Sequence, residues 1–373
     1  MLRWTITVLI AAVLILITIG VVMLASASML DGGRFVWKQI MWLGVGIPGA
    51  LVCAKLDLRW IRRLTIPFAL LCVFLLVLVR IPGIGVNVNG SWRWLRFGAF
   101  TLQPSELAKI GLILTISWWI ATQRRYMYTF KRGTLVPMLF LAVCTGLLII
   151  EPDFGTAILI SLVVVIMIYA GGSRPVWLIS LGSLGAAAVG LLIWKNPNRM
   201  GRIIAFLDPE KYAQGEAWQL INGIAAFAAG GAHGAGLGNS IQKHHYLPEA
   251  HTDFILPIIG EELGLIFTLF ILILFVVIFI CGLRIAAHAS DDFGKFTAFG
   301  CTMMITLQAV INFAVVTGSM PTKGLALPFI SYGGSSLMVS SAMIGLLINV
   351  AHTARSPKEK KRNALFKDKK RKG

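Results

Sequence analysis

Four acidic residues lie close together in the segment 246–264, which reads YLPEAHTDFILPIIGEELG. This segment joins a long polar loop to an apolar stretch that continues to Cys281. A carboxylate at membrane depth is costly unless it is paired or hydrated, so it indicates a functional site. We predict that Asp253 is the catalytic residue. The residues expected to support it in this segment are Glu249, His251, Thr252, Glu261 and Glu262.

Aromatic and basic residues alternate in the segment 89–98, which reads NGSWRWLRFG. Tryptophans anchor proteins at the membrane–water boundary, and guanidinium groups bind phosphates through paired hydrogen bonds. Arg96 is therefore predicted to bind a phosphate group of a substrate. Trp92 is either a support for the site or an ordinary interfacial anchor.

A charged pair begins the next apolar run, in the motif QPSELAK at 103–109. Glu106 and Lys109 are three residues apart and share one face of a helix. One interpretation is a structural ion pair within the membrane. The other is that Glu106 lines a polar cavity while Lys109 attracts an anionic headgroup, and both can hold together.

Hydroxyl groups and a lysine gather in the segment 318–336, GSMPTKGLALPFISYGGSS. Prolines and glycines break a helix here, and only local polar partners can satisfy such a break at membrane depth. The small residues alone are compatible with close helix packing. The charge and hydroxyl groups favour substrate binding instead, by Lys323, Ser331, Tyr332 and Ser335.

Two other motifs are interpreted as structural. EPDFGT at 151–156 is predicted to form a short turn between two membrane helices, because proline and glycine favour turns. GAGLG at 234–238 has no preceding strand and no βαβ unit, so it is predicted to be a loop rather than a dinucleotide site.

The composition predicts the framework that holds these segments. Hydrophobic residues make up 57% of the 373 residues and charged residues only 13%. Apolar runs long enough to cross about 30 Å of hydrocarbon recur along the chain. The predicted fold is an all-α polytopic membrane protein with ten transmembrane helices and cysteines that form no disulfides. The helices are expected at 6–27, 37–54, 64–80, 104–121, 134–151, 156–171, 176–194, 257–283, 295–317 and 332–353.

Charge distribution predicts the orientation of these helices. Lysines and arginines cluster in alternate short connections and after Ala354, which the positive-inside rule makes cytoplasmic. Both termini are then cytoplasmic, and residues 1–354 form one membrane domain with a large extracytoplasmic loop at 195–256. In that loop, 218–229 is apolar enough to lie along the membrane or re-enter it. Ten of the 34 lysines and arginines behind the net charge of +18 lie in a basic tail, 355–373, which is expected to attract anionic lipid headgroups rather than nucleic acid.

Five motifs, and their order along the chain, resemble those of the SEDS family of bacterial cell-wall proteins. The resemblance implies a SEDS-type fold of ten helices, peptidoglycan glycosyltransferase activity on lipid II, and a class B penicillin-binding protein as partner. It also implies that the aspartate of the HTDF motif, Asp253 here, is catalytic. The PTKG sequence at 321–324 looks more like the division branch of the family than the elongation branch. The motifs are HTDFI at 251–255, GEELG at 260–264, QPSELAK at 103–109, EPDFG at 151–155 and KGLALPFISYGGSS at 323–336.

A mechanism follows from this resemblance as a hypothesis. Asp253 would take the proton from the 4-hydroxyl of an incoming lipid II as a general base. The growing glycan strand would leave its undecaprenyl pyrophosphate, whose charge needs to be neutralised. Either basic residues or a divalent cation, Mg²⁺ or Mn²⁺, would do this, with no organic cofactor. The basic residues considered are Arg96, Lys109, Arg202 and Lys323.

A zinc site is the less favoured use of the histidines near Asp253, because His244, His245 and His251 lack the spacing of a helical pair. The expected location is the bacterial plasma membrane at the division septum, beside other divisome proteins. Two other functions remain open, a lipid II flippase and a non-catalytic scaffold for the penicillin-binding protein. A flippase needs a polar route that continues to the cytoplasmic side, whereas the embedded charges here lie toward the outer half.

Overall fold

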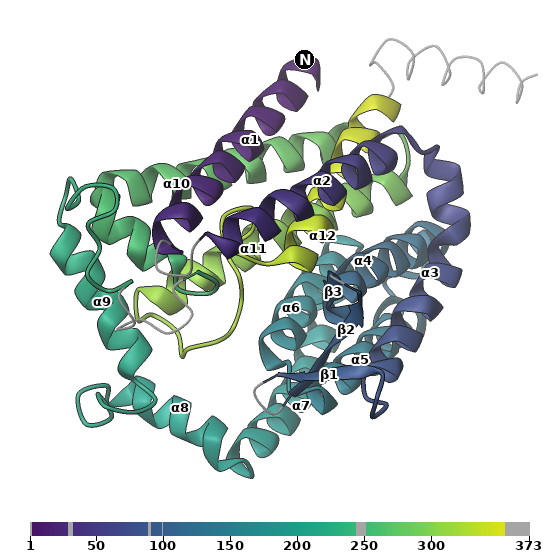
Figure 1. Ribbon diagram of the computed structural model, residues 1–373. Helices are drawn as coiled ribbons and strands as arrows, with labels where there is room; N and C mark the ends of the chain where they lie inside the picture. Colours follow the sequence, from purple (N-terminus) through teal and green to yellow (C-terminus); the bar gives the residue numbers. More distant parts are fainter. Residues whose placement is uncertain (1, 29–32, 89–90, 99, 244–250, 355–373) are drawn as a thin grey trace, which may run out of the picture.

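The computed structural model describes residues 2–28, 33–88, 91–98, 100–243 and 251–354 (Figure 1). Eight of its helical segments are long and apolar enough to cross a membrane. The 17-residue α6 (Phe154–Ala170) and the charged α4 (Pro104–Gln123) occupy the two remaining predicted positions. The predicted all-α polytopic membrane fold is therefore confirmed. The other eight are α1 (Leu2–Ala27), α2 (Arg34–Lys55), α3 (Leu58–Leu78), α5 (Val136–Ile150) with a preceding π-helical turn (Phe130–Leu135), α7 (Pro175–Trp194), α10 (Ile255–His288), α11 (Asp292–Val316) and α12 (Gly334–Thr353).

Packing divides the helices into a central group and a periphery. α2 runs alongside α12, and α1 lies against α10 (Figure 1). α4 contacts α3, α6 and α11, and most of its side chains are buried. α7 has almost no buried side chains, and its apolar surface is the kind that lipid covers. A 3₁₀ turn (Arg124–Tyr126) follows α4.

A small antiparallel sheet lies between α3 and α4, in a segment whose secondary structure was not predicted. It consists of β1 (Gly85–Val88), β2 (Ser91–Phe97) and β3 (Phe100–Leu102) in that order. The aromatic residues of β2 suit a pleated, half-buried surface. Leu95 pairs with Leu102 and is buried, which fixes the register of the last two strands.

Two further helices interrupt the long segment between α7 and α10. α8 (Pro197–Leu207) follows α7, and α9 (Trp218–Gly230) packs against α10. A Cβ atom at Gly230 would collide with the main chain of Gly260 and Glu261, so glycine permits this close approach of α9 to α10. The apolar stretch 218–229 therefore forms a helix held against the membrane domain.

α10 is not the uninterrupted helix that its apolar run predicts. Gly264 has φ 80° and ψ 178°, which breaks the helix within the hydrocarbon region. The loop 231–243 returns to this break, where Leu265 N donates to Gly231 O at 2.9 Å and Ala235 N donates to Glu261 O at 2.9 Å. The backbone groups freed by the break are satisfied inside the protein, as a membrane requires.

Candidate functional site

A cavity of about 910 Å³ opens where α4, α8, α9, α12, the sheet and the turn that precedes α10 come together. The segments predicted to carry chemistry meet here although they are far apart in the sequence. We call it the candidate cavity. The predicted site residues that line it are Glu106, Arg202, Thr252, Asp253, Lys323 and Tyr332.

Asp253 lies in the turn that precedes α10, packed against the segment that contains Lys323. A Cβ atom on Gly324 would lie 3.0 Å from Asp253 Oδ2, so the carboxylate rests directly on the glycine. Tyr332 N donates to His251 O at 2.9 Å, which ties the same turn to the residues before α12. The predicted general base and the predicted cation thus come from two segments held side by side.

The segment 317–333 keeps its non-helical course through side chains that bond to its backbone. Ser331 Oγ accepts from Leu327 N at 2.8 Å, and Gln308 Nε2 donates to Ala326 O at 2.7 Å. Ser331 is buried and does not line the cavity. Its hydroxyl shapes the wall that carries Lys323.

Ser335 joins the start of α12 to the start of α4. Its Oγ accepts from Gln103 N at 3.0 Å and donates to Thr101 O at 3.1 Å. It also lies behind the cavity wall, whereas Ser336, which was not among the predicted site residues, lines the cavity.

Glu106 and Lys109 form an ion pair, and Glu106 also lines the cavity. Lys109 Nζ lies 2.7 Å from Glu106 Oε1 and donates to Gln308 Oε1 at 3.0 Å. The Lys109 side chain is 1% exposed. Its charge is therefore held behind Glu106, one layer away from the cavity surface.

Of the two arginines predicted to bind substrate, Arg96 and Arg202, the structure places only one in the cavity lining. Arg202 on α8 lines the cavity, but Arg96 lies exposed on β2 and is not part of the lining. Arg93 lines it instead, and donates to Glu151 O at 3.0 Å and to Pro152 O at 2.7 Å. Sequence reasoning assigned Arg93 only to the membrane boundary and chose Arg96 as the phosphate-binding residue, because the strand was not recognised. Trp92 is half-buried beside it but does not line the cavity, whereas Trp94 does.

Burial changes the acid–base properties of three groups around this cavity. It lowers the pKa of Lys323 and raises the pKa of Tyr332. It also raises the pKa of Glu151 to about 8, together with the charge of Asp153 and against the opposing charges of Arg93 and Arg80. Both Glu151 carboxylate oxygens lack a hydrogen-bond partner among the described residues, which suits the neutral form.

Glu261 and Glu262 do not line the cavity but hold the loop 231–243. Glu261 accepts from Ile241 N at 2.9 Å and from the Ser240 hydroxyl. Glu262 lies 3.0 Å from Lys243 Nζ and accepts from Ser26 on α1. Sequence reasoning missed Lys243, whose side chain is buried beside the Glu262 carboxylate.

The remaining predicted residues lie near the base. His251 stacks on Phe35 with ring centroids 4.2 Å apart, next to Tyr332. Glu249 lies outside the described residues, as do His244 and His245. The described part of the chain contains no group of three or more His, Cys, Asp or Glu suited to hold a metal ion.

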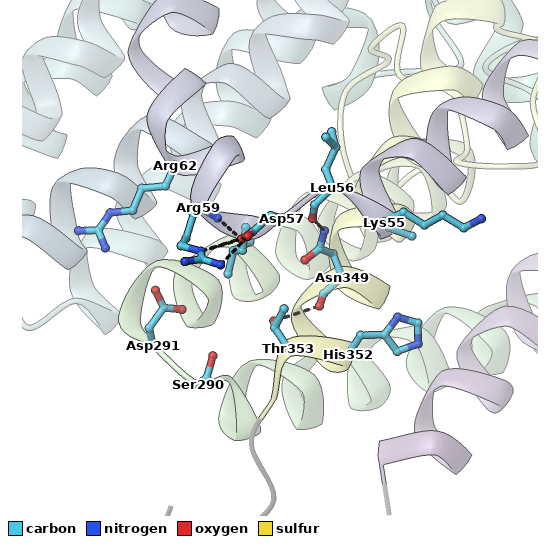
Figure 2. Close-up of a pocket in the computed structure, with 12 residues that line it drawn as sticks. Lys55, Leu56, Asp57, Arg59, Arg62, Ser290, Asp291, Asn349, His352 and Thr353 are labelled. Carbon is cyan, nitrogen blue, oxygen red and sulfur yellow. Dashed lines mark hydrogen bonds and ion pairs between the residues drawn. The ribbon is translucent and has the colours of Figure 1, made fainter. Parts of the chain in front are cut away.

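A second cavity of about 860 Å³ lies at the other ends of α2, α3, α11 and α12 (Figure 2). We call it the opposite cavity. Its acids act as helix caps, because Asp57 accepts from Arg59 N at 2.9 Å and Asp291 accepts from Gly294 N at 3.1 Å. Lys55 and Arg62 point away from its centre in opposite directions (Figure 2).

Asn349 closes the opposite cavity from α12. Its amide nitrogen donates to the main-chain oxygen of Leu56 (Figure 2) and also to that of Cys53, at the end of α2. The polar groups here end and join helices. The candidate cavity is the one lined by the predicted site residues Asp253, Glu106 and Lys323.

A sequence profile of the cell cycle protein family that comprises FtsW, RodA and SpoVE matches residues 6–356. The chain belongs to this family. It is 43% identical over 351 residues to the probable peptidoglycan glycosyltransferase FtsW of Trichlorobacter lovleyi, covering 92% of each chain. It is also 38% identical over 350 residues to the stage V sporulation protein E of Bacillus subtilis, covering 92% of this chain and 95% of that one.

The fold of the family is found in solved structures as well. A chain of a peptidoglycan synthase complex superposes with a TM-score of 0.78 at 28% identity, over 92% of this chain and 96% of that chain. The work on that complex concerns its coordination of polymerization and crosslinking. The predicted SEDS-type fold is therefore confirmed.

Proposed function

We propose that the protein is a peptidoglycan glycosyltransferase that polymerises lipid II into glycan strands during cell division. The observation that carries the proposal is the meeting of Asp253, Glu106, Arg202 and Lys323 in one cavity of a member of this family. A carboxylate and cations around a shared space suit the transfer of a sugar from a pyrophosphate to a hydroxyl group.

Asp253 acts as the general base in the proposed reaction. Its carboxylate takes the proton from the 4-hydroxyl of the acceptor lipid II, and the oxygen attacks the anomeric carbon of the donor strand. The bond from that carbon to pyrophosphate breaks, and undecaprenyl pyrophosphate leaves with the electron pair. Pyrophosphate needs no protonation to leave, so the second carboxylic acid used by glycoside hydrolases is not required.

Lys323 and Arg202 neutralise the charge that develops on the pyrophosphate, because both line the cavity with the base. Arg93 joins them at the wall, although its guanidinium is already bonded to main-chain oxygens. Arg96 does not line the cavity, so it would bind a phosphate group of the substrate beyond the cavity wall. Lys109 does not reach the cavity surface and would act through its ion pair with Glu106. These two assignments stay predictions.

A divalent cation is a further prediction. Mg²⁺ or Mn²⁺ would supply positive charge to the pyrophosphate when bound. Glu106 and Asp253 are the predicted carboxylates on the cavity surface. The described residues offer no cluster typical of a resident metal, so we assign no protein site to such a cation.

The proposed setting follows the charge distribution of the sequence. Both termini lie in the cytoplasm, the candidate cavity opens outward, and the protein works at the septum of the plasma membrane. The proposed partners are a class B penicillin-binding protein, which crosslinks the new strands, and other divisome proteins. The relation to a chain of a peptidoglycan synthase complex supports the first of these.

Polymerisation of purified lipid II by the protein with its penicillin-binding partner tests the proposal. Asp253→Asn should lower the rate by about 10²–10⁴-fold, because general-base catalysis contributes that much. Folding and partner binding should not change, because the side chain keeps its shape. Asp57→Asn, at the opposite cavity, should leave the rate unchanged.

Three outcomes would contradict the proposal. A wild-type rate for Asp253→Asn would remove the general base. Polymerisation by the partner alone would favour a scaffold. Transbilayer movement of lipid II by the purified protein, without polymer, would favour a flippase.

A further inference from the structure

Asn312, near the end of α11, joins two segments that are far apart in the sequence. Its Nδ2 donates to Asp253 O at 2.9 Å and to Leu325 O at 2.8 Å. Leu325 follows Lys323 by two residues. We infer that Asn312 is a positioning residue that holds Asp253 in register with Lys323. The inference rests on the proposed role of Asp253 as the general base.

The amide of Asn312 can lie only one way round. Two carbonyl oxygens face its nitrogen, so exchanging the nitrogen and oxygen would bring three acceptors together with no proton between them. Asn312 Oδ1 is buried and accepts no hydrogen bond within the part of the chain that the structure describes. An unpaired buried acceptor costs free energy. The side chain therefore contributes through its two donors.

Gln308, one helical turn earlier, holds the next residue of the same segment. Its Nε2 donates to Ala326 O at 2.7 Å, and its Oε1 accepts from Lys109 at 3.0 Å. Residues four apart share one helix face. This face of α11 therefore fixes two successive carbonyl groups after Lys323 and links them to the buried Lys109–Glu106 pair.

The position of the Asp253 carboxylate leaves little room for error. Its Oδ2 would be only 3.0 Å from a Cβ atom on Gly324, so a shift of either segment changes the contact directly. Misplacing a reacting group by about 1 Å can cost about 10²-fold in rate. Asn312 bridges these two carbonyl groups directly, so its loss removes a link between the two segments.

The test uses Asn349 as a matched control. Asn349 is also buried, and its amide nitrogen also donates to two main-chain oxygens, but at the opposite cavity. Asn312→Ala and Asn349→Ala are compared for lipid II polymerisation by the full-length protein with its partner, and for melting temperature. Asn312→Asp adds a variant of the same shape. An aspartate side chain has at most one proton to donate, whereas the asparagine amide donates two, to Asp253 O and Leu325 O.

Both alanine variants should lower the melting temperature by similar amounts. Asn312→Ala and Asn312→Asp should lower kcat by about 10²-fold, with KM for lipid II changed less than about threefold. Asn349→Ala should change kcat less than about twofold. A loss confined to kcat indicates misplacement of the base, whereas general destabilisation would affect both asparagines alike.

Asp253→Asn separates failure of this inference from failure of the proposed function. Wild-type polymerisation by Asp253→Asn would overturn the proposed function itself. An inactive Asp253→Asn beside an Asn312→Ala that matches Asn349→Ala would overturn only the positioning role. If Asn312→Ala does not fold, Asn312→Asp decides, because wild-type kcat in that variant would show that shape suffices.

Discussion

The candidate cavity and the opposite cavity lie at the two ends of α12 and have similar volumes, about 910 and 860 Å³. They differ in how their charged groups are held. The Arg59 side chain of the opposite cavity is 87% exposed, and its partner Asp57 is 43% exposed. Lys109 and Glu106 at the candidate cavity are 1% and 9% exposed.

This difference decides what each pair of charges can do. An exposed pair is hydrated and screened, so it contributes little and its geometry is free to vary. A buried pair has lost its water and persists only in good geometry with further hydrogen bonds, as Lys109 has with Gln308. Glu106, which lines the candidate cavity, is therefore fixed in a way that the Asp57–Arg59 pair at the opposite cavity is not.

The backbone around the two cavities differs in the same way. Ordinary helix ends with carboxylate caps surround the opposite cavity. The segment 317–333 and the turn at 251–254 surround the candidate cavity, and neither continues a helix. Buried side chains must satisfy the backbone of such segments. The polar residues of α11 serve the candidate cavity for this reason.

The largest expected difference between the cavities is in stability. Glu106→Gln leaves the Lys109 charge buried without its carboxylate, which should reduce the free energy of unfolding by about 3–5 kcal/mol. Asp57→Asn should have little effect, because its pair is exposed and asparagine also caps helices well. Denaturation of both purified variants in the same micelles measures the difference, and equal losses would contradict the comparison.

The pH dependence of stability provides a second difference. Glu151 beside the candidate cavity has a pKa raised to about 8 by burial, so the folded protein holds its proton above the pH at which the unfolded chain, with a usual glutamate pKa near 4.5, loses it. Its contribution to stability is complete below about pH 4.5 and is lost as the pH rises to about 8. Melting temperatures across this range should fall less steeply for Glu151→Gln than for the wild type.

Asp57, at the opposite cavity, should make stability change with pH in the opposite direction. The hydrogen bond from Arg59 lowers its pKa, so its contribution to stability is present above the usual aspartate pKa and is lost as the pH falls below it. Asp57→Asn should therefore leave the slope between pH 5 and 8 unchanged. A parallel change in both variants would show that Glu151 does not cause the slope.

The membrane helices could be predicted from the sequence because each consists of an apolar run of sufficient length. The break at Gly264 could not, because the apolar run continues past it and the loop that satisfies it starts more than twenty residues earlier. The sheet at 85–102 was missed because its strands are short, and because β2 is rich in arginine and tryptophan, which also suit a membrane surface.

The site was predictable where residue type alone implies function. Asp253, Glu106 and Lys323 are costly charges in an apolar chain, and the structure brings all three to the candidate cavity. Ser331 and Ser335 were predicted to contact substrate, but a hydroxyl group does not reveal whether it bonds to a ligand or to a distant backbone. Asn312 and Gln308 carry no charge, so nothing in the sequence singled them out. Their role became visible only from the hydrogen bonds that they make in the structure.

Substrate affinity should distinguish the lysines of the two cavities. Lys323→Gln should raise KM for lipid II about tenfold, which corresponds to about 1.4 kcal/mol, while Lys55→Gln should have no effect. Burial lowers the pKa of Lys323, so it loses its charge at a lower pH than an ordinary lysine. KM should therefore rise early on the alkaline side, and Lys323→Arg should move that rise to higher pH. If the rise of KM at alkaline pH is the same in Lys323→Arg as in the wild type, another group causes it.

Two glycines provide the finest comparison, because each faces a carboxylate at the same distance. A Cβ atom would lie 3.0 Å from Asp253 Oδ2 at Gly324, and 3.0 Å from Asp291 Oδ1 at Gly294. An alanine at either position requires the carboxylate to move by a few tenths of an ångström. At Gly324 this displaces the proposed base, and kcat should fall about fivefold if the cost scales with displacement.

At Gly294 the same movement displaces only a helix cap. Gly294→Ala should alter the melting temperature while leaving kcat unchanged, because Asp291 takes no part in the proposed chemistry. Measuring both variants with saturating lipid II separates the two effects. A loss of activity in Gly294→Ala equal to that in Gly324→Ala would mean that the two ends of the helices are coupled, and that fixed geometry at the candidate cavity depends on the opposite cavity as well.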